Sequence, residues 1–447
     1  MSETPGMGEP PAPDAALAPD AAPGAQAAPG ARATLRALFD AMVRRGDPLH
    51  TLPALLPEKP RGRVVLLGAG KAAARMAEAV ESRWGPCTGL VVTRGGYTRP
   101  GLGVEVVEAG HPYPDASGSR AARRMMDIAR GLGPGDTAVC LVSGGASSLL
   151  SLPPPGIGLD DIRSLTEALL SSGAPIEDVN VVRRHLCAAK GGRLALAAHP
   201  ARVLSFVISD VPGDDLALVG SGPTVGHDSG PEDVRAILDR YEVAVPAGVG
   251  AHLAMATSHA APNDPRLATT TNTLLVSPAQ ALAHVVARAR RDGFHVTDLG
   301  AEVEGDAATV ARTHADMALA IHSDPLRPTP HLILSGGELT VTVRGGGSGG
   351  PNAEYALALA IALNGHPGIH AMACDTDGVD GIADIAGAFV HPATLAAARR
   401  AGRVPENDLA ANDAHSFHAA AGGSVETGPT YTNVNDFRAI LIGGDPG

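Results

Sequence analysis

Short apolar runs alternate with glycine-rich turns and helical patterns along most of the chain. Four such runs in the first half fall at residues 63–67, 90–93, 137–142 and 203–208. Runs that are apolar at every position and alternate with helices are typical of a parallel sheet covered on both faces. Before them, the spacing of apolar residues at 35–43 predicts an amphipathic helix.

The pattern restarts in the second half after a proline- and alanine-rich stretch, 241–267, which we expect to connect two domains. A helix is expected at 279–290, and residues 339–343 alternate in the way of a half-buried strand. Further strands are expected at 273–276, 295–298, 331–334 and 371–374. The length of 447 residues also favours two domains. The predicted fold class is α/β, with ligands at the carboxyl ends of the strands.

Composition narrows the classes of partner. The net charge of −12 argues against a nucleic acid, because phosphate backbones are bound by basic surfaces. No run of 18 apolar residues predicts a membrane span, and the first residues do not resemble a signal peptide. Four scattered cysteines without a C-x-x-C pair favour free thiols and a cytoplasmic location. Residues 1–30, rich in Ala, Pro and Gly, are expected to form a disordered tail.

One glycine-rich turn places a cation between a strand and a helix. Gly70 precedes Lys71 there, and backbone N–H groups at a helix start favour an anion. The turn is not a P-loop, which needs Ser or Thr where Ala72 stands. It is not a dinucleotide fingerprint either, because the third glycine would fall at Ala73. Taken alone, these residues fit a tight turn with a solvated lysine better than an anion site.

A second turn combines glycines with hydroxyl groups. Ser143, Gly144, Gly145 and Ser147 follow the run at 137–142, and such a turn can form a nest for phosphate or carboxylate. A glycine turn with a serine helix cap is an equally good interpretation of this segment.

The densest positive cluster lies at 183–193. Arg183 and Lys190 are seven residues apart, which predicts that they share one face of a helix. Charge runs usually form solvated faces, but glycines directly after Lys190 would let a ligand approach the backbone. We therefore expect this cluster to hold an anionic substrate.

Carboxylates gather in two later turns, at 209–215 and at 375–380. A carboxylate such as Asp210 at a strand end can accept a proton from a hydroxyl or hold Mg²⁺, and phosphoryl transfer needs both. Turn chemistry accounts for many of the same residues. The second turn lacks the glutamate of a calcium loop, and the histidines show no zinc-binding spacing.

Eight segments, taken in order, carry a family resemblance. They read GAGKAAARMAEAVE, EAGHPYPD, LVSGGASSLLSLP, NVVRRHLCAAKGGRLA, SDVPGDDLALVGSGPTV, LSGGELTVTVRG, DTDGVDG and TGPTYTNVNDF. Together they resemble the class II glycerate kinase family, which phosphorylates D-glycerate, usually at the 2-hydroxyl, with ATP and Mg²⁺. The resemblance covers about residues 33–442.

The resemblance implies two α/β domains with the active site in the cleft between them. The larger would be a Rossmann-like α/β/α sandwich at 31–265, and the smaller a MOFRL-like domain at 270–447. The implied reaction is ATP-dependent phosphorylation of D-glycerate to 2-phosphoglycerate, or of a closely related small hydroxy acid. The enzyme would act as a monomer or homodimer.

Carried over position by position, the resemblance makes Lys71, Asp210 and Glu338 the expected catalytic residues. Asp210 and Asp377 would be the Mg²⁺ ligands. The expected substrate and phosphate ligands are Ser143, Gly144, Gly145, Ser147, Arg183, Lys190, Ser221, Gly222, Thr224, Asn352 and Asn435.

One loop departs from the family pattern. Where the family has GRGGRNQE, this chain reads GSGGPNAE at 347–354, so Ser348 and Pro351 replace two arginines. Loss of a guanidinium that neutralises phosphoryl charge could lower the rate by ~10³-fold or more. Arg344 would compensate if its side chain turned into the cleft. Tyr97 also stands where a histidine is common.

Two alternatives therefore stay open beside the kinase. Family relatives often carry a hydroxypyruvate reductase name, although the chain lacks the G-x-G-x-x-G of a nicotinamide enzyme. The missing arginines favour a descendant that binds but does not catalyse. The polar residues that the chain retains argue against this binding-only alternative.

Overall fold

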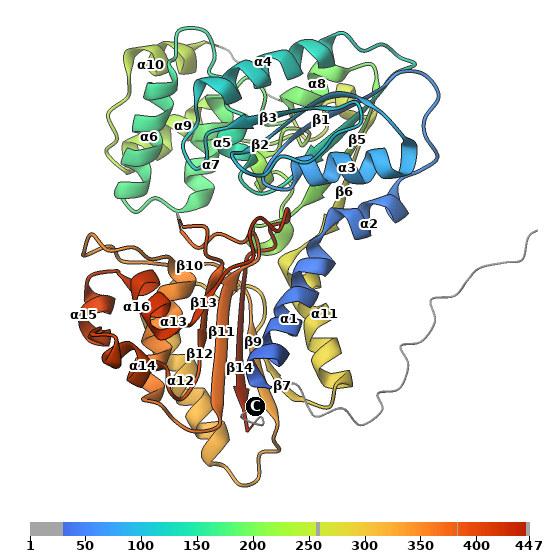
Figure 1. Ribbon diagram of the computed structural model, residues 1–447. Coiled ribbons are helices and arrows are strands. Elements are labelled where there is room, and N and C mark those ends of the chain that lie inside the picture. Colours follow the sequence, from blue (N-terminus) through green and yellow to red (C-terminus); the bar gives the residue numbers. More distant parts are fainter. Residues whose placement is uncertain (1–29, 256–259, 382, 444–447) are drawn as a thin grey trace, which may run out of the picture.

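The first sheet of the computed structural model consists of six parallel strands in the order β3-β2-β1-β4-β5-β6 (Figure 1). The strands are β1 (Val64–Ala69), β2 (Thr88–Arg94), β3 (Glu105–Ala109), β4 (Thr137–Val142), β5 (Arg202–Ile208) and β6 (Thr270–Val276). This order is that of a Rossmann-type doubly wound sheet, as predicted. The structure describes residues 30–255, 260–381 and 383–443, so the predicted tail lies outside them except for Gly30.

Both faces of this sheet are buried, which explains the uninterrupted apolar runs. Leu66 of β1 packs toward a core that includes α2 and α3, whereas Val65 and Leu67 pack toward α4, α5 and α8 on the other face. Successive strand residues point to opposite faces, so both positions must be apolar. The helices are α2 (Pro48–Leu55), α3 (Ala73–Trp84), α4 (Ala116–Arg130), α5 (Ala146–Leu149) and α8 (Arg193–Ala198).

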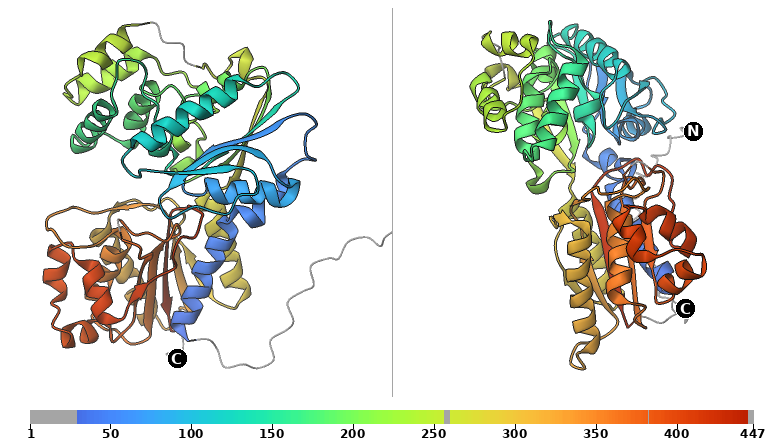
Figure 2. Two further views of the ribbon diagram at one scale, coloured as in Figure 1. Left: turned by 45° about the horizontal axis from the view of Figure 1, so that its top comes forward. Right: turned by 90° about the vertical axis from the view of Figure 1, so that its left-hand side faces the viewer.

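Four helices form a separate group beside this sheet (Figure 2). They have a core of their own, in which Leu169, Val182 and Leu238 are buried. They are α6 (Leu159–Ser171), α7 (Ile176–His185), α9 (Pro231–Arg240) and α10 (Ala247–Ala254). Short 3₁₀ turns connect this part of the chain at Pro212–Asp214, Val219–Ser221 and Pro265–Leu267.

The second sheet also has six strands, in the order β13-β12-β11-β14-β9-β7. They are β7 (His295–Asp298), β9 (His331–Ser335), β11 (Ile369–Asp375), β12 (Gly387–Val390), β13 (Ser424–Val425) and β14 (Asp436–Ile442). Only β7 and β9 are parallel, and the other neighbours are antiparallel. This sheet is therefore mixed, whereas the first sheet is wholly parallel. A run of apolar residues indicates that both faces of a strand are buried, but it does not indicate whether the strand is parallel or antiparallel to its neighbours.

Helices cover both faces of the second sheet. On one face lie α12 (Ala307–Ser323), α13 (Pro351–Leu363), α14 (Thr394–Arg400), α15 (Pro405–Ala410) and α16 (Ala414–Ala421). On the other, α1 (Ala31–Gly46) and α11 (Pro278–Arg291) lie side by side (Figure 1). Their core is continuous with the α2 and α3 side of the first sheet.

The expected domain boundary at 265–270 does not follow the sheets. β6, expected to begin the smaller domain, pairs with β5 as the edge strand of the first sheet. α1, expected in the larger domain, contacts α11, β11 and β14 instead. The amphipathic pattern of α1 was right, but it does not say which sheet the apolar face covers.

The half-buried strand expected at 339–343 is largely absent. Only Leu339 and Thr340 form a strand, β10 (Leu339–Thr340), which pairs with the two-residue β8 (Gly305–Asp306). The Asn412 side chain then bonds the carbonyl of Thr342 and the N–H of Arg344, which replaces strand pairing.

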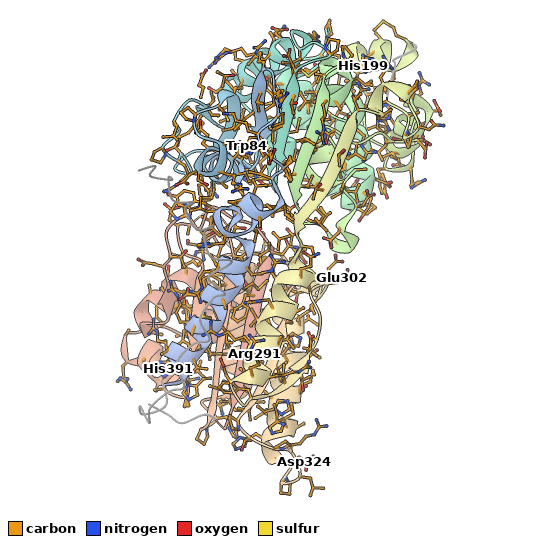
Figure 3. The ribbon with its side chains drawn as sticks, turned by 90° about the vertical axis from the view of Figure 1, so that its right-hand side faces the viewer. Trp84, His199, Arg291, Glu302, Asp324 and His391 are labelled. Carbon is orange, nitrogen blue, oxygen red and sulfur yellow. The ribbon has the colours of Figure 1, made fainter. Side chains whose placement is uncertain are left out.

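Loops from the two halves touch at the junction of the sheets. Gly213 N–H donates to Glu302, which Figure 3 shows between the upper and lower parts of the molecule. Thr432 Oγ1 donates to the carbonyl of Gly46 at 2.8 Å. Within the described residues, none of the helices has the length and apolar character needed to cross a bilayer.

Candidate active site at the switch point of the first sheet

The site lies where the strand order reverses, between β1 and β4. The helix after β1 and the helix after β4 cover opposite faces, so the two loops diverge and leave a crevice. Lys71 N–H donates to the Gly144 carbonyl at 2.9 Å, and Ala72 N–H donates to Ser143 Oγ at 3.0 Å. A Cβ at Gly70 would lie 2.1 Å from Ser143 Oγ, which explains the glycine. The two loops therefore form one rigid floor.

Lys71 joins the two domains at this floor. Its Nζ forms an ion pair with Asp377, which follows β11 in the second domain. Burial disfavours the charged form of Lys71, yet Asp377, Asp375 and Asp210 together hold its pKa above the ordinary value of a lysine. Lys71 is therefore a permanent cation at the crevice, as its predicted role requires.

Tyr97 fixes the same turn from the other side. Its hydroxyl donates to the Asp377 carbonyl at 2.8 Å, and its ring meets the edge of Tyr431 at 6.0 Å. Guanidinium groups lie over both rings, Arg94 over Tyr97 and Arg99 over Tyr431, each at 4.8 Å. This cluster of Arg94, Tyr97, Arg99 and Tyr431 joins the first domain to the loop before β14.

Asp210 and Glu338 are two of the three acids that line the crevice, and the third is Glu177. Asp210 accepts from Asn433 Nδ2 at 3.2 Å, and burial raises the pKa of Asp210 although Lys71 partly offsets the rise. Burial of the carboxyl group, reinforced by Asp210 and Asp436, raises the pKa of Glu338 to about 7. Glu338 is nevertheless exposed toward the crevice, so water weakens this effect. A carboxylate with a pKa near neutrality is suited to accept a proton.

A cavity of about 250 Å³ occupies the crevice. Asp210 and Glu338 line it together with Gly145, Ser147 and Arg183, so five of the predicted residues meet there. Lys71 lies directly behind, because a Cβ at Gly145 would be 3.3 Å from Lys71 Cγ. Gly144 is also required, since a Cβ there would be 2.1 Å from Asp210 Oδ2.

The serine pair and the buried lysine support the rim of this cavity. Ser147 Oγ and Ser221 Oγ are hydrogen bonded, and Lys190 Nζ donates to the Ser147 carbonyl at 2.6 Å. The expected shared helix face of Arg183 and Lys190 is wrong, because α7 ends at His185 and Lys190 follows in a turn. The glycine turn, not helical spacing, brings Lys190 to the site.

Several predicted ligands are instead buried in structural roles. Ser143 Oγ accepts the N–H of Ala72, and Thr224 bonds Ser205 and Asn272. Gly222 adopts a positive φ of 59° in a turn. Two further residues that were predicted to bind substrate or phosphate, Asn352 and Asn435, are also buried. The sequence shows which residues carry hydroxyl and amide groups, but it does not show which hydrogen-bond partners these groups have within the fold.

The acids at 375–380 divide between two places. Asp377 faces Lys71, and its other oxygen accepts the N–H of Val379 at 2.8 Å. Both oxygens are thus engaged, so the structure does not present Asp377 as an open Mg²⁺ ligand. Asp380 instead accepts the first N–H groups of α13, from Asn352 and Ala353. Within the described residues there is no group of three or more His, Cys, Asp or Glu side chains arranged for a metal ion.

The loop that lacks the family arginines does not bring Arg344 to the crevice. Arg344 is exposed and lines a different surface cavity, beside Glu354 and Asn412. Pro351 is the first residue of α13, where a proline is well tolerated. The condition for compensation by Arg344, a side chain turned into the cleft, is therefore not met in this structure.

The sequence did not identify His111 and Asn433 as site residues, and it pointed to Asp375 only within the carboxylate turn at 375–380. His111 lines the cavity, where burial and the nearby Lys71 lower the pKa of His111 to about 3. Asn433 holds Asp210, and Asp375 lies near Lys71. His111 and Asn433 both lie in segments that carried the family resemblance, and their place in those segments is the sequence signal that could have identified them as site residues.

Comparison with known proteins identifies relatives of this chain. Residues 34–254 match a family model described as a domain of unknown function, and residues 331–436 match the MOFRL family. The D-glycerate 2-kinase of Thermotoga maritima is 36% identical, over 88% of this chain and 94% of its own length. A protein of Agrobacterium vitis, provisionally named a hydroxypyruvate reductase, is 45% identical over 92% of this chain and 94% of its own length.

Solved structures show the same fold. The crystal structure of Thermotoga maritima glycerate kinase matches with a TM-score of 0.79 and 34% identity, covering 91% of this chain and 98% of that one. A Pyrococcus horikoshii protein matches with a TM-score of 0.75 and 31% identity, covering 94% and 100%. The paired domains, the matched segments and these relatives agree, and the chain belongs to the class II glycerate kinase family.

Proposed function

We propose that this protein transfers the γ-phosphoryl group of ATP to the 2-hydroxyl of D-glycerate. The observation that carries the proposal is the meeting of Lys71, Asp210 and Glu338 at the switch point of the first sheet. A fixed cation next to a carboxyl group whose pKa is raised supplies the charge stabilisation and the proton acceptor that phosphoryl transfer needs. The Thermotoga maritima relative bears the name of this activity.

Glu338 is the proposed base. The glycerate oxygen forms a bond to the γ-phosphorus while the bond from that phosphorus to the β,γ-bridging oxygen breaks, and ADP leaves. The hydroxyl proton passes to the Glu338 carboxylate. Lys71 stabilises the charge on the transferring group, and Asp377 keeps the ammonium charged and oriented. Arg183, which lines the same cavity, supplies a guanidinium for anionic groups.

Mg²⁺ fits the oxygen donors of this crevice. Mg²⁺ in such enzymes is held by one or two carboxylates together with substrate phosphates, and Asp210 is a half-buried carboxylate that lines the cavity. When bound, the ion would neutralise charge on the phosphate oxygens. Asp377 would hold Lys71 rather than the metal.

An ADP-release assay tests the proposal against its alternatives. We expect Mg²⁺-dependent ADP formation with D-glycerate and little with L-glycerate. Glu338→Gln should lower the rate of ADP formation by ~10²–10⁴-fold, whereas Glu302→Gln, which changes an acid outside the cavity, should leave it unchanged. NADH-dependent reduction of hydroxypyruvate would favour the reductase, and ATP binding without turnover would favour the binding-only descendant. The proposal also includes a cytoplasmic location and a monomeric or homodimeric state.

A further inference from the structure

A second cavity of about 250 Å³ adjoins the first. Pro112, Ser147 and Arg183 line both cavities, so the two spaces meet at these residues. Each is smaller than the ~300–1,000 Å³ of typical ligand sites, whereas the joined space falls within that range. The second cavity therefore extends the crevice away from Asp210 and Glu338.

The far side of the second cavity is apolar and open to a ligand. Tyr113 follows β3, and Leu170 lies near the end of α6, so the walls come from different elements. These side chains are 57% and 53% exposed, although large apolar side chains are normally buried. Ile162 and Pro114 complete the apolar lining. A flat apolar ligand would remove this surface from water.

Polar groups at the edge of the cavity provide hydrogen bonds for such a ligand. Thr166 and Glu167 on α6 line the cavity beside Arg163. The Nε of Arg163 is buried and has no hydrogen-bond partner within the described residues. A buried donor without a partner is costly, and a ligand acceptor would satisfy it.

The junction of the two cavities is positively charged. Lys190 is 2% exposed, and its ammonium has three N–H donors, yet among the described residues it bonds only the Ser147 carbonyl. Burial lowers the pKa of Lys190 to about 8 and also lowers the pKa of Arg183. No carboxylate in the described part of the chain pairs with either cation. An anion at the junction would supply the missing acceptors.

We infer that the second cavity receives the purine and ribose of ATP, and that Arg183 and Lys190 meet its phosphate chain where the cavities join. The γ-phosphoryl group then enters the first cavity, between glycerate and Lys71. This inference rests on the proposed function, because it assigns the donor end of the same reaction.

Leu170→Glu tests the assignment, because an exposed position tolerates the change while a carboxylate in the apolar wall would lose its hydration when the uncharged purine packs against it. We expect the KM for ATP, and the Kd for ADP measured by calorimetry, to rise at least about tenfold, ~1.4 kcal/mol, with the KM for glycerate unchanged. Leu55→Glu, an equally exposed leucine of α2, is the matched control and should change neither.

Two results would overturn the assignment. A rise in the KM for glycerate alone would make the second cavity the acceptor site. Unchanged ATP and ADP constants in an active Leu170→Glu enzyme would remove the cavity from the reaction. If the unmodified protein binds ADP but phosphorylates nothing, the proposed function fails, and a selective loss of ADP binding in Leu170→Glu still supports the assignment.

Discussion

Replacing Lys71 by methionine removes the cation that pairs with the buried Asp377 and lies near the half-buried Asp375 and Asp210. Met is similar in length and apolar, so the change deletes the charge without opening a large cavity. Lys71 and Asp377 side chains are 14% and 1% exposed, which makes this a buried ion pair. The variant leaves Asp377, Asp375 and Asp210 without their cation.

The expected loss of stability follows from this burial. Removing one member of a buried pair costs ~3–5 kcal/mol, because the remaining charge is uncompensated. We therefore expect Lys71→Met to unfold at clearly lower urea concentration at pH 7, and to lose activity by roughly 10³-fold or more. The double variant with Asp377→Asn should be less destabilised than the sum of the single variants, because the two side chains interact directly.

The pH dependence has a definite sign. Because the pKa of Lys71 is raised in the folded protein, its contribution to the free energy of unfolding is complete below the pKa of an unfolded lysine, ~10.4. This contribution is lost as the pH rises through the pKa of Lys71 in the folded protein. In the variant, burial already raises the pKa of Asp210, and protonation removes the uncompensated charge. The difference in unfolding free energy should therefore shrink as pH falls from 7 toward 4.

Urea denaturation of both proteins between pH 4 and pH 9 measures this difference. Lys59→Met, which changes an exposed lysine, is the control and should cost less than ~1 kcal/mol. Equal stability of Lys71→Met and Lys59→Met at pH 7 would refute the reasoning. A destabilisation that stays constant with pH would refute its electrostatic part.

Three further changes test other parts of the site. Glu338→Gln should lower kcat by ~10²–10⁴-fold and remove the rise of kcat with pH near 7, because the base must be deprotonated; an unchanged pH–rate profile would exclude this role. Gly144→Ala should disable catalysis, since its Cβ would lie 2.1 Å from Asp210 Oδ2, and full activity in steady-state kinetics would contradict that. Tyr97→Phe should cost ~0.5–1.5 kcal/mol in urea denaturation by removing the bond to the Asp377 carbonyl, whereas no change would show that the bond contributes nothing.

Much of the fold could be predicted because burial leaves a local trace in the sequence. The strand at 137–142 was predicted with its observed bounds, and the helix at 279–290 lies within α11. The strand at 339–343 failed because its pattern is local, whereas its backbone partners come from Asn412. The place of α1 could not be read from its own residues either, since both sheets offer an apolar face.

The site was predicted through its loops and less well through its contacts. Lys71 and Asp377 are 306 positions apart, so only the fold could show that they pair. Ser143 and Thr224 lie in two of the predicted loops, but backbone or neighbouring groups already occupy their hydroxyls. Residue type indicates what a side chain can bind, and packing decides what it does bind.

Phosphorus NMR of a reaction with D-glycerate, ATP and Mg²⁺ tests the central claim most directly. The account predicts equal amounts of ADP and 2-phosphoglycerate, both absent when Lys71→Met replaces the unmodified protein. Formation of 3-phosphoglycerate would contradict the assigned hydroxyl. The absence of any phosphorylated glycerate would contradict the proposed kinase itself.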